Sequence, residues 1–252
     1  MTAGAVVITA ADGSLAGLAE RLRDARVPVR ERPLLRFAPP ATWAALDDAL
    51  RHLDEVVALA VTSPRAGRAV AARHEVLRGR GEAGPLDRVT VWAAGGASAA
   101  TLRHLVPGVR LPDGARASKQ GAAARLARAM LAAGVAGPVL FPCGDLRRDE
   151  LPRLLREAGV EVREVRCYRT ELASEADARA VAGAGEIVVV TSPSVAHLLS
   201  RACDGGPRPR LLAIGPSTAD AARGHGWEPA AVAARADVDA VLEGLHALLA
   251  VH

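Results

Sequence analysis

Short apolar runs recur along the chain, and each one precedes a segment with the period of an α-helix. Examples are AVVIT at 5–9, VVALAVT at 56–62 and EIVVVT at 186–191. These runs do not alternate apolar with polar residues, so both faces of each expected strand must be buried. Continuously apolar strands that alternate with helices favour parallel sheets with helices on both faces. The sequence therefore predicts an α/β fold.

Helical period and capping residues place the expected helices between these strands. Ser14 and Thr42 stand where N-caps are expected, and Gly134 stands where a helix is expected to end. The segments 27–36 and 160–170 are expected to be extended. The expected helices span 14–25, 41–53, 66–77, 99–105, 118–134, 146–159, 195–202, 219–226 and 237–251.

Three blocks occur twice in the same order, which predicts an internal duplication. The tetrapeptide Val-Thr-Ser-Pro begins at Val61 and again at Val190, 129 residues later. Glycine turns at Gly95 and Gly215 are 120 residues apart, and the stretches LAERLRDARVPVRE and LPRLLREAGVEVRE are 133 residues apart. Unrelated strand–helix units also resemble one another, so generic similarity is the alternative. Two similar α/β domains are expected, bridged by the extended segments.

Composition favours an acidic small molecule as the ligand. The net charge is +4, and because Lys119 is the only lysine, almost every cation is an arginine. Arginine suits bidentate binding of carboxylate or phosphate. Only 2% of the residues are aromatic and no dense basic run occurs, which disfavours nucleic acid as a partner.

Cysteine spacing and the N-terminal sequence predict a soluble, cytoplasmic protein. The three cysteines are widely spaced without a CxxC motif, so neither a disulfide framework nor a zinc site is expected. The first residues lack the features of a secretory signal, and no apolar run has the length of a membrane span. The seven histidines show no metal-ligand spacing.

Hydroxyl and glycine residues gather in four turns that follow expected strands. In a parallel sheet such turns lie at the carboxyl ends of the strands, beside helix N-termini, where unpaired N–H groups and the helix dipole favour anions. Gly95, Gly96 and Gly215 would let a ligand approach the backbone. The simpler interpretation is that these residues only cap helices. The hydroxyl residues are Thr62, Ser63, Ser98, Thr191, Ser192, Ser194, Ser217 and Thr218.

Tyr168 is the only tyrosine and stands on an expected extended segment. Its phenol could donate a proton or a hydrogen bond into a cleft between domains. A tyrosine on a strand is more often half-buried packing, and that interpretation stays open. Cys143 follows an expected strand, but no histidine is spaced to make it a nucleophile.

Taken together, these stretches resemble the uroporphyrinogen-III synthase family. VTSPRA and VTSPSVAHLL are similar to the family's paired Thr-Ser-Pro turns, and AIGPSTADAARGHGWEP is similar to its Gly-Pro-x-Thr turn and following helix. The stretch LRRDELPRLLREAGVEVREVRCYRT is similar to the family segment that ends in Tyr-x-Thr. The order and spacing agree over nearly the whole chain.

The resemblance implies two flavodoxin-like parallel-sheet domains joined by a two-stranded linker. One domain would comprise 1–33 with 171–252, the other 37–165, and the linker strands 34–36 with 166–170. The implied reaction closes hydroxymethylbilane to uroporphyrinogen III, inverts the last ring and uses neither metal nor cofactor. Tyr168 matches the tyrosine thought to assist departure of the hydroxyl group, Ser98 stands where the family has a cleft threonine, and Ser194 and Thr218 fall on cleft turns. A monomer that accepts its substrate from hydroxymethylbilane synthase is expected.

The sequence also departs from the family pattern. Ala10 and Cys143 stand where many members have arginine, so two cationic contacts are missing. A non-catalytic tetrapyrrole- or anion-binding module is therefore the alternative function. The Ser/Thr-rich turns by themselves suggest a third function, that of a phosphosugar-binding α/β domain. The cations that could compensate are Arg65, Lys119, Arg147, Arg148 and Arg210.

Overall fold

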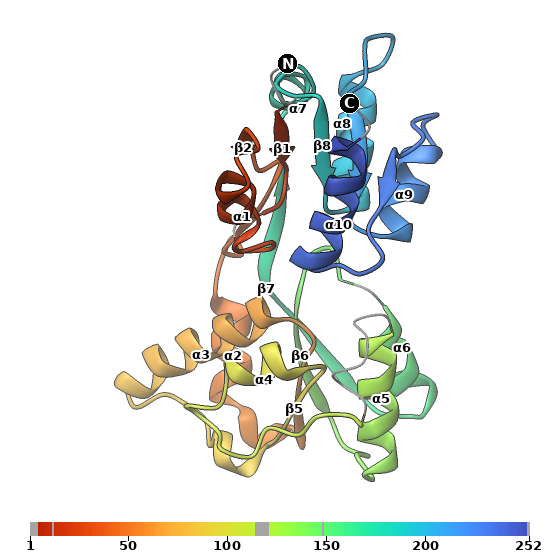
Figure 1. Cartoon of the computed structure of the whole chain (residues 1–252). Coiled ribbons are helices and arrows are strands. Elements are labelled where there is room, and N and C mark those ends of the chain that lie inside the picture. The colour runs from red at the N-terminus through yellow and green to blue at the C-terminus, as the bar shows by residue number, and fades with distance from the viewer. Residues whose placement is uncertain (1–4, 12, 114–120, 148, 251–252) are drawn as a thin grey trace. The chain divides into compact units, whose positions relative to one another are not determined.

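A computed structural model describes residues 5–11, 13–113, 121–147 and 149–250. The chain forms two compact units (Figure 1). Unit 1 comprises Met1–Phe37 with Glu171–His252, and unit 2 comprises Ala38–Thr170. Lys119 and Arg148, two of the cations named above, lie outside the described residues.

Unit 1 is built on a five-stranded sheet in the order β10-β9-β8-β1-β2, with parallel pairing throughout. Its apolar strands bury side chains on both faces. Val7, Val188 and Leu211 pack towards α7–α9, whereas Val6 and Leu212 pack towards α1 and α10. The strands are β1 (Val6–Ile8), β2 (Val29–Glu31), β8 (Ile187–Val190), β9 (Arg210–Ala213) and β10 (Ala231–Val232), and the helices are α1 (Leu18–Asp24), α7 (Glu175–Ala182), α8 (Pro193–Ala202), α9 (Pro216–Arg223) and α10 (Val238–Leu249).

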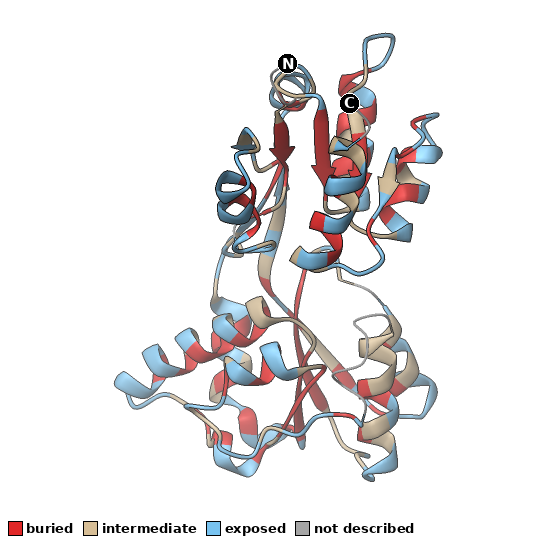
Figure 2. Ribbon diagram, viewed as in Figure 1, coloured by how far each residue is buried: buried red, intermediate tan, exposed pale blue. Residues whose placement is uncertain are grey.

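Unit 2 contains most of a second five-stranded sheet, in the order β3-β7-β6-β4-β5, in which β4, β5, β6 and β7 pair in parallel. Residues 35–37 of β3 and 171–172 of β7 belong to unit 1. Leu59 and Val91 pack towards α2 and α3 on one face, and Ala60, Trp92 and Phe141 pack towards α5 and α6 on the other. Figure 2 shows the central strands of this sheet buried along their length. The strands are β3 (Leu35–Ala38), β4 (Ala58–Val61), β5 (Thr90–Ala93), β6 (Val139–Gly144) and β7 (Val162–Leu172), and the helices are α2 (Ala44–Arg51), α3 (Pro64–Gly79), α4 (Gly96–Ala100), α5 (Ala122–Ala132) and α6 (Glu150–Glu157), with 3₁₀ turns at Leu53–Glu55 and Leu86–Arg88.

The prediction of an α/β fold with parallel sheets is confirmed, whereas several expected helix starts are wrong. α1 begins at Leu18 because Gly17 adopts a left-handed conformation (φ 87°), and Ser14 lies in the preceding turn. The hydroxyl oxygen of Thr42 accepts a hydrogen bond from the N–H of Ala44 (3.2 Å), but Trp43 is the residue that precedes α2. Helical period alone does not locate these starts, because the flanking turns contain the same alanines and leucines.

Other expected helices differ in length, and two elements were missed. The helix expected at 99–105 is α4, which starts at Gly96 and ends at Ala100; the one expected at 146–159 starts only at Glu150. Gly134 has φ 78° just beyond α5, the expected geometry of a helix end. β10 and α7 were not anticipated, although Ser174 and Asp177 form a capping box at the start of α7, a pattern that sequence alone displays.

No helix among the described residues is long and apolar enough to cross a membrane.

A partly buried ion pair joins two helices of unit 2 and gives a test of its stability. Arg73 on α3 donates two hydrogen bonds of 2.7 and 2.6 Å to Asp47 on α2, and the guanidinium of Arg73 lies 5.5 Å from the centre of the Trp43 ring. The hydrogen bonds from Arg73 hold the pKa of Asp47 below its usual value of 3.8, against the opposing effect of burial. The pair therefore stabilises the folded state most when the carboxyl group is ionised.

Replacing Asp47 with alanine is expected to lower the free energy of unfolding by about 1–3 kcal/mol at neutral pH, because it leaves Arg73 without its partner. Since the folded-state pKa of Asp47 is depressed, the difference from wild type is fully present above the unfolded pKa and declines as the pH falls through the folded pKa. Urea unfolding at about pH 7 and about pH 3 measures this difference. Asp48→Ala, at an exposed neighbouring position, is the control; an equal effect of the two substitutions would contradict the assignment.

Candidate functional site

The two Val-Thr-Ser-Pro turns have the same local geometry in the two units. Ser63 follows β4 and its hydroxyl oxygen accepts a hydrogen bond from the N–H of Ala66 (3.1 Å) at the start of α3. Ser192 follows β8 and accepts from the N–H of Val195 (3.2 Å) at the start of α8. Both serines have extended backbones, and a proline follows each one. The capping interpretation is therefore confirmed at Ser63 and Ser192, and the remaining first-turn N–H groups lie at the carboxyl ends of the strands.

The two glycine turns also match each other. The carbonyl of Gly95 accepts from the N–H groups three and four residues ahead at the start of α4, and the carbonyl of Gly215 does the same at α9. The residues three positions ahead, Ser98 and Thr218, are 4% and 1% exposed. A Cβ atom added at Gly215 would meet no atom within 4 Å, so space is open above the backbone there.

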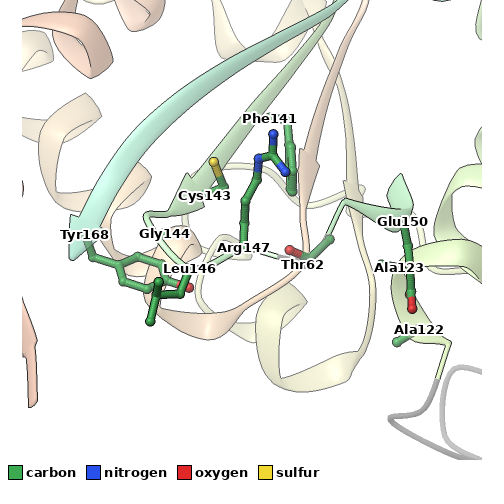
Figure 3. Close-up of a pocket in the computed structure, with 10 residues that line it drawn as sticks. All are labelled: Thr62, Ala122, Ala123, Phe141, Cys143, Gly144, Leu146, Arg147, Glu150 and Tyr168. Carbon is green, nitrogen blue, oxygen red and sulfur yellow. The ribbon is translucent and has the colours of Figure 1, made fainter. Parts of the chain in front are cut away.

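A pocket of about 300 Å³ opens at the carboxyl ends of the unit 2 strands (Figure 3). Its wall combines the turn after β4, the end of β6 and the loop that follows it, the first turns of α5 and α6, and one side chain of β7. Because Ala122 and Ala123 are the first two residues of α5, their N–H groups have no partner within the helix. The lining residues are Thr62, Ala122, Ala123, Phe141, Cys143, Gly144, Leu146, Arg147, Glu150 and Tyr168.

Tyr168 is half-buried at the wall of this pocket. Tyr168 on β7 pairs with Gly144 on β6, and its phenol oxygen lies 3.5 Å from the hydroxyl oxygen of Ser63. Burial raises the pKa of the phenol above 10, while the hydrogen bond to Ser63 and the charge of Arg65 act in the opposite direction. The phenol is therefore protonated at neutral pH and has a proton to donate. The ring also packs against the core on the α2–α3 side of the sheet, so the packing and pocket interpretations both apply.

Arg147 brings a positive charge into the pocket beside Cys143. Figure 3 shows its side chain extended towards Phe141 and Cys143, and its guanidinium interacts with the thiol of Cys143. It donates a 2.9 Å hydrogen bond to Asp149 and pairs with Glu164, which Arg156 also contacts at 2.6 Å. The cation is thus held in place by two carboxylates.

Within unit 2, only some of the residues predicted as the site come together. Thr62 and Tyr168 line the pocket, and Ser63 reaches the phenol. Arg65 follows on α3, where burial lowers the pKa of its guanidinium and Tyr168 opposes that effect. Ser98 lies in unit 2 after β5 but does not line this pocket. Five other predicted site residues belong to unit 1, where they follow β8 and β9: Thr191, Ser192, Ser194, Ser217 and Thr218.

Arg210 is the candidate that the fold separates from the turns. It stands at the amino end of β9, so it lies at the opposite edge of the sheet from Gly215. There it donates a 2.9 Å hydrogen bond to the carbonyl of Leu248 and lies 3.8 Å from Glu186. The direction of β9 therefore places Arg210 away from the turn that contains Gly215.

Sequence reasoning did not place Cys143, Gly144, Leu146 and Glu150 in the site. All four lie at the end of β6, in the loop after it or at the start of α6. Because ligands of parallel sheets bind at the carboxyl ends of the strands, this position in the sequence could have identified them. Among the described residues, no group of three or more His, Cys, Asp and Glu is arranged to hold a metal ion.

Comparison with known proteins identifies the family that this chain resembles. The sequence model of the family described as uroporphyrinogen-III synthase HemD matches residues 16–243. A search of curated proteins found no match.

Two solved structures share the fold. A mutant uroporphyrinogen III synthase from the extremely thermophilic bacterium Thermus thermophilus superposes with a TM-score of 0.66 at 17% identity, covering 98% of this chain and 99% of the other. The uroporphyrinogen-III synthetase of Helicobacter pylori superposes with a TM-score of 0.62 at 19% identity, covering 96% of this chain and 98% of the other.

The pocket thiol is expected to be unreactive in the folded protein. Burial raises the pKa of Cys143 to about 11 and that of Cys167 to about 12, and it also raises the pKa of Cys203. Because the thiolate is the reactive form, native protein near pH 7.5 should react slowly with Ellman's reagent. All three thiols should react rapidly only after the protein is unfolded. The unfolded Cys143→Ser variant should show two reactive thiols. Rapid reaction of one thiol in the native protein, lost in the Cys143→Ser variant, would show that Cys143 is an activated nucleophile instead.

Proposed function

Because the chain belongs to the uroporphyrinogen-III synthase family, we propose that it closes hydroxymethylbilane to uroporphyrinogen III and inverts the last pyrrole ring. The observation that carries this proposal is the family match over residues 16–243, to which the pocket with Tyr168 on its wall adds a candidate site. The enzyme is then a cyclising lyase of porphyrin biosynthesis. The substrate loses one water molecule as the ring closes, and the reaction involves no net oxidation or reduction.

The chemistry of the substrate agrees with the groups at the strand ends. Each pyrrole of hydroxymethylbilane carries an acetate and a propionate, so the substrate is an acidic small molecule. Helix N-termini favour such anions through unpaired N–H groups and the helix dipole. In unit 2 the first-turn amides of α5, the hydroxyl of Thr62 and the guanidinium of Arg147 supply donors around one pocket. The unit 1 turns that end in Ser194 and Thr218 would offer further amides and hydroxyls.

Tyr168 is the group proposed to assist departure of the substrate's hydroxyl. A leaving hydroxyl group needs a proton, and the raised pKa of the phenol keeps that proton in place at neutral pH. Loss of water gives an azafulvene cation. Attack on this cation forms a spiro intermediate, which rearranges, and the ring then closes. The rest of the site would act by holding the flexible chain in a reactive conformation.

The domain arrangement extends this proposal. Each unit would be a flavodoxin-like domain, with segments 34–36 and 166–170 as the linker strands between them. Support comes from the parallel pairing of the unit 1 strands and of β4–β7 in unit 2, and from the matching turns at Ser63 and Ser192. A cytoplasmic monomer that receives hydroxymethylbilane from its synthase is part of the same proposal.

The alternative is a tetrapyrrole- or anion-binding module without activity. It is favoured by Ala10 and Cys143, which replace arginines found in many family members. The position of Arg147 weakens it, because this guanidinium, although paired with Asp149 and Glu164, reaches Cys143 and so places an arginine at the end of β6.

Incubation with freshly prepared hydroxymethylbilane, followed by oxidation and chromatographic separation of the porphyrin isomers, tests the proposal. The expected product is mainly the type III isomer, whereas the reaction without protein gives the uninverted type I isomer. Type I product alone, together with saturable binding of uroporphyrinogen, would favour the binding module. Type I product without such binding would contradict both functions.

Tyr168→Phe is expected to lower kcat by about 10²-fold, because it removes the proton donor and keeps the ring. KM should change little, and the far-ultraviolet circular dichroism should match wild type. Steady-state kinetics with isomer analysis make the measurement. Unchanged turnover would assign Tyr168 to packing alone.

A further inference from the structure

Gly144 forms the surface on which the ring of Tyr168 lies. A Cβ atom built on Gly144 would approach Cε2 of Tyr168 to 2.4 Å, Cζ to 2.5 Å and the phenol oxygen to 2.9 Å. All three atoms belong to the phenol end of the ring, which is rigid. Any side chain at position 144 would therefore push the phenol away from its present position.

An irregularity between β6 and β7 brings the ring to this place. Cys143 pairs with Arg166 and Gly144 pairs with Tyr168, so Cys167 has no opposite residue. In a regular strand, successive side chains point to opposite faces. Here Cys167 and Tyr168, although adjacent, both pack against the core cluster on the α2–α3 side. A bulge of this kind re-aims a side chain, and in this chain the re-aimed side chain is the phenol.

Ser63 connects the phenol to the start of α3. Its hydroxyl oxygen accepts the hydrogen bond from the N–H of Ala66 and lies 3.5 Å from the phenol oxygen, at the long end of hydrogen-bonding distance. A hydroxyl group has one donor and two acceptor sites, so it can serve both partners at once. The cap thus fixes the serine oxygen, which in turn restrains the phenol oxygen.

The equivalent serine of unit 1 shows that the cap alone does not require a phenol. Ser192 caps α8 with the same geometry as Ser63, but Tyr168 is the only tyrosine in the chain. The hydrogen bond to the phenol is therefore an addition made in unit 2, and Ser192 offers a matched control for loss of a cap.

We propose that Gly144 and Ser63 are positioning residues for Tyr168: the bare backbone of Gly144 admits the ring at the pocket wall, and the hydroxyl of Ser63 holds the phenol oxygen. This inference rests on the function proposed above, since it concerns how the proposed proton donor is held. The titratable groups that act on the phenol are Arg65 from α3, Cys143 from β6 and Cys167 from β7.

Fluorine NMR gives a readout that does not depend on activity. Because Tyr168 is the only tyrosine, incorporation of 3-fluorotyrosine gives one signal, whose titration reports the phenol directly. Ser63→Ala should move the titration midpoint upward, because it removes the hydrogen bond that lowers the pKa. Gly144→Ala should move it downward, because a displaced ring is more exposed to water, and burial affects this pKa more than the hydrogen bond to Ser63 does. Ser192→Ala should leave it unchanged.

Kinetics separate positioning from general damage. Ser63→Ala is expected to lower kcat by about 10-fold with a smaller effect on KM, and Ser63→Thr, which keeps the hydroxyl, should restore most of the loss. Gly144→Ala is expected to lower kcat towards the Tyr168→Phe level. In the Tyr168→Phe background, neither substitution should lower kcat much further, because residues that act through one group are not additive.

Several results would overturn the inference. Additive losses in the double variants would mean that Gly144 and Ser63 act independently of the phenol. An unshifted fluorine titration in Gly144→Ala, or equal shifts in Ser63→Ala and Ser192→Ala, would mean that the phenol is not held by these residues. Failure of the proposed function is distinguishable: wild-type protein would then form no type III isomer, while the fluorine titrations would still test how the phenol is held.

Discussion

Burial of parallel strands on both faces is the constraint on which the rest of this structure depends. Once helices cover both faces of a sheet, polar chemistry can be presented only at the ends of the strands. The carboxyl ends coincide with helix N-termini, whose unpaired N–H groups must find partners. The same arrangement that completes the core therefore supplies donors for an anion. In unit 2 this produces a pocket whose wall includes the turn after β4, the end of β6 and the start of α5.

The sequence predicted the fold well because the strand signal is strong. Runs such as Ile187–Val190 contain no polar residue, and each was found as a central strand buried on both faces. Helix starts were predicted less well. Gly17 adopts a positive φ just before α1, and helical period in the sequence does not mark that change of backbone conformation. The cap at Ser63 was predictable, because serine followed by proline fits both the cap position and the first helical position.

The site was harder to predict because it depends on pairing between strands. Tyr168 could be singled out as the only tyrosine, but its place beside Ser63 results from the irregular pairing of β6 with β7. No local sequence pattern predicts this shift in pairing between β6 and β7. Arg210 illustrates the opposite error: it lies close to Gly215 in sequence, yet a strand of only four residues separates the two ends of the sheet. Direction along the strand, which sequence does reveal, would have excluded it.

The two Thr-Ser-Pro turns show how one local structure supports different chemistry. Ser63 and Ser192 make equivalent caps, so the backbone at both turns presents similar donors. Only in unit 2 does an adjacent strand bring a phenol to the capping serine. The glycine that permits this contact follows Cys143, and the guanidinium of Arg147 reaches that thiol from the loop beyond. Arg147 is held there by Asp149 and Glu164, whereas the place of the phenol ring requires a glycine at position 144.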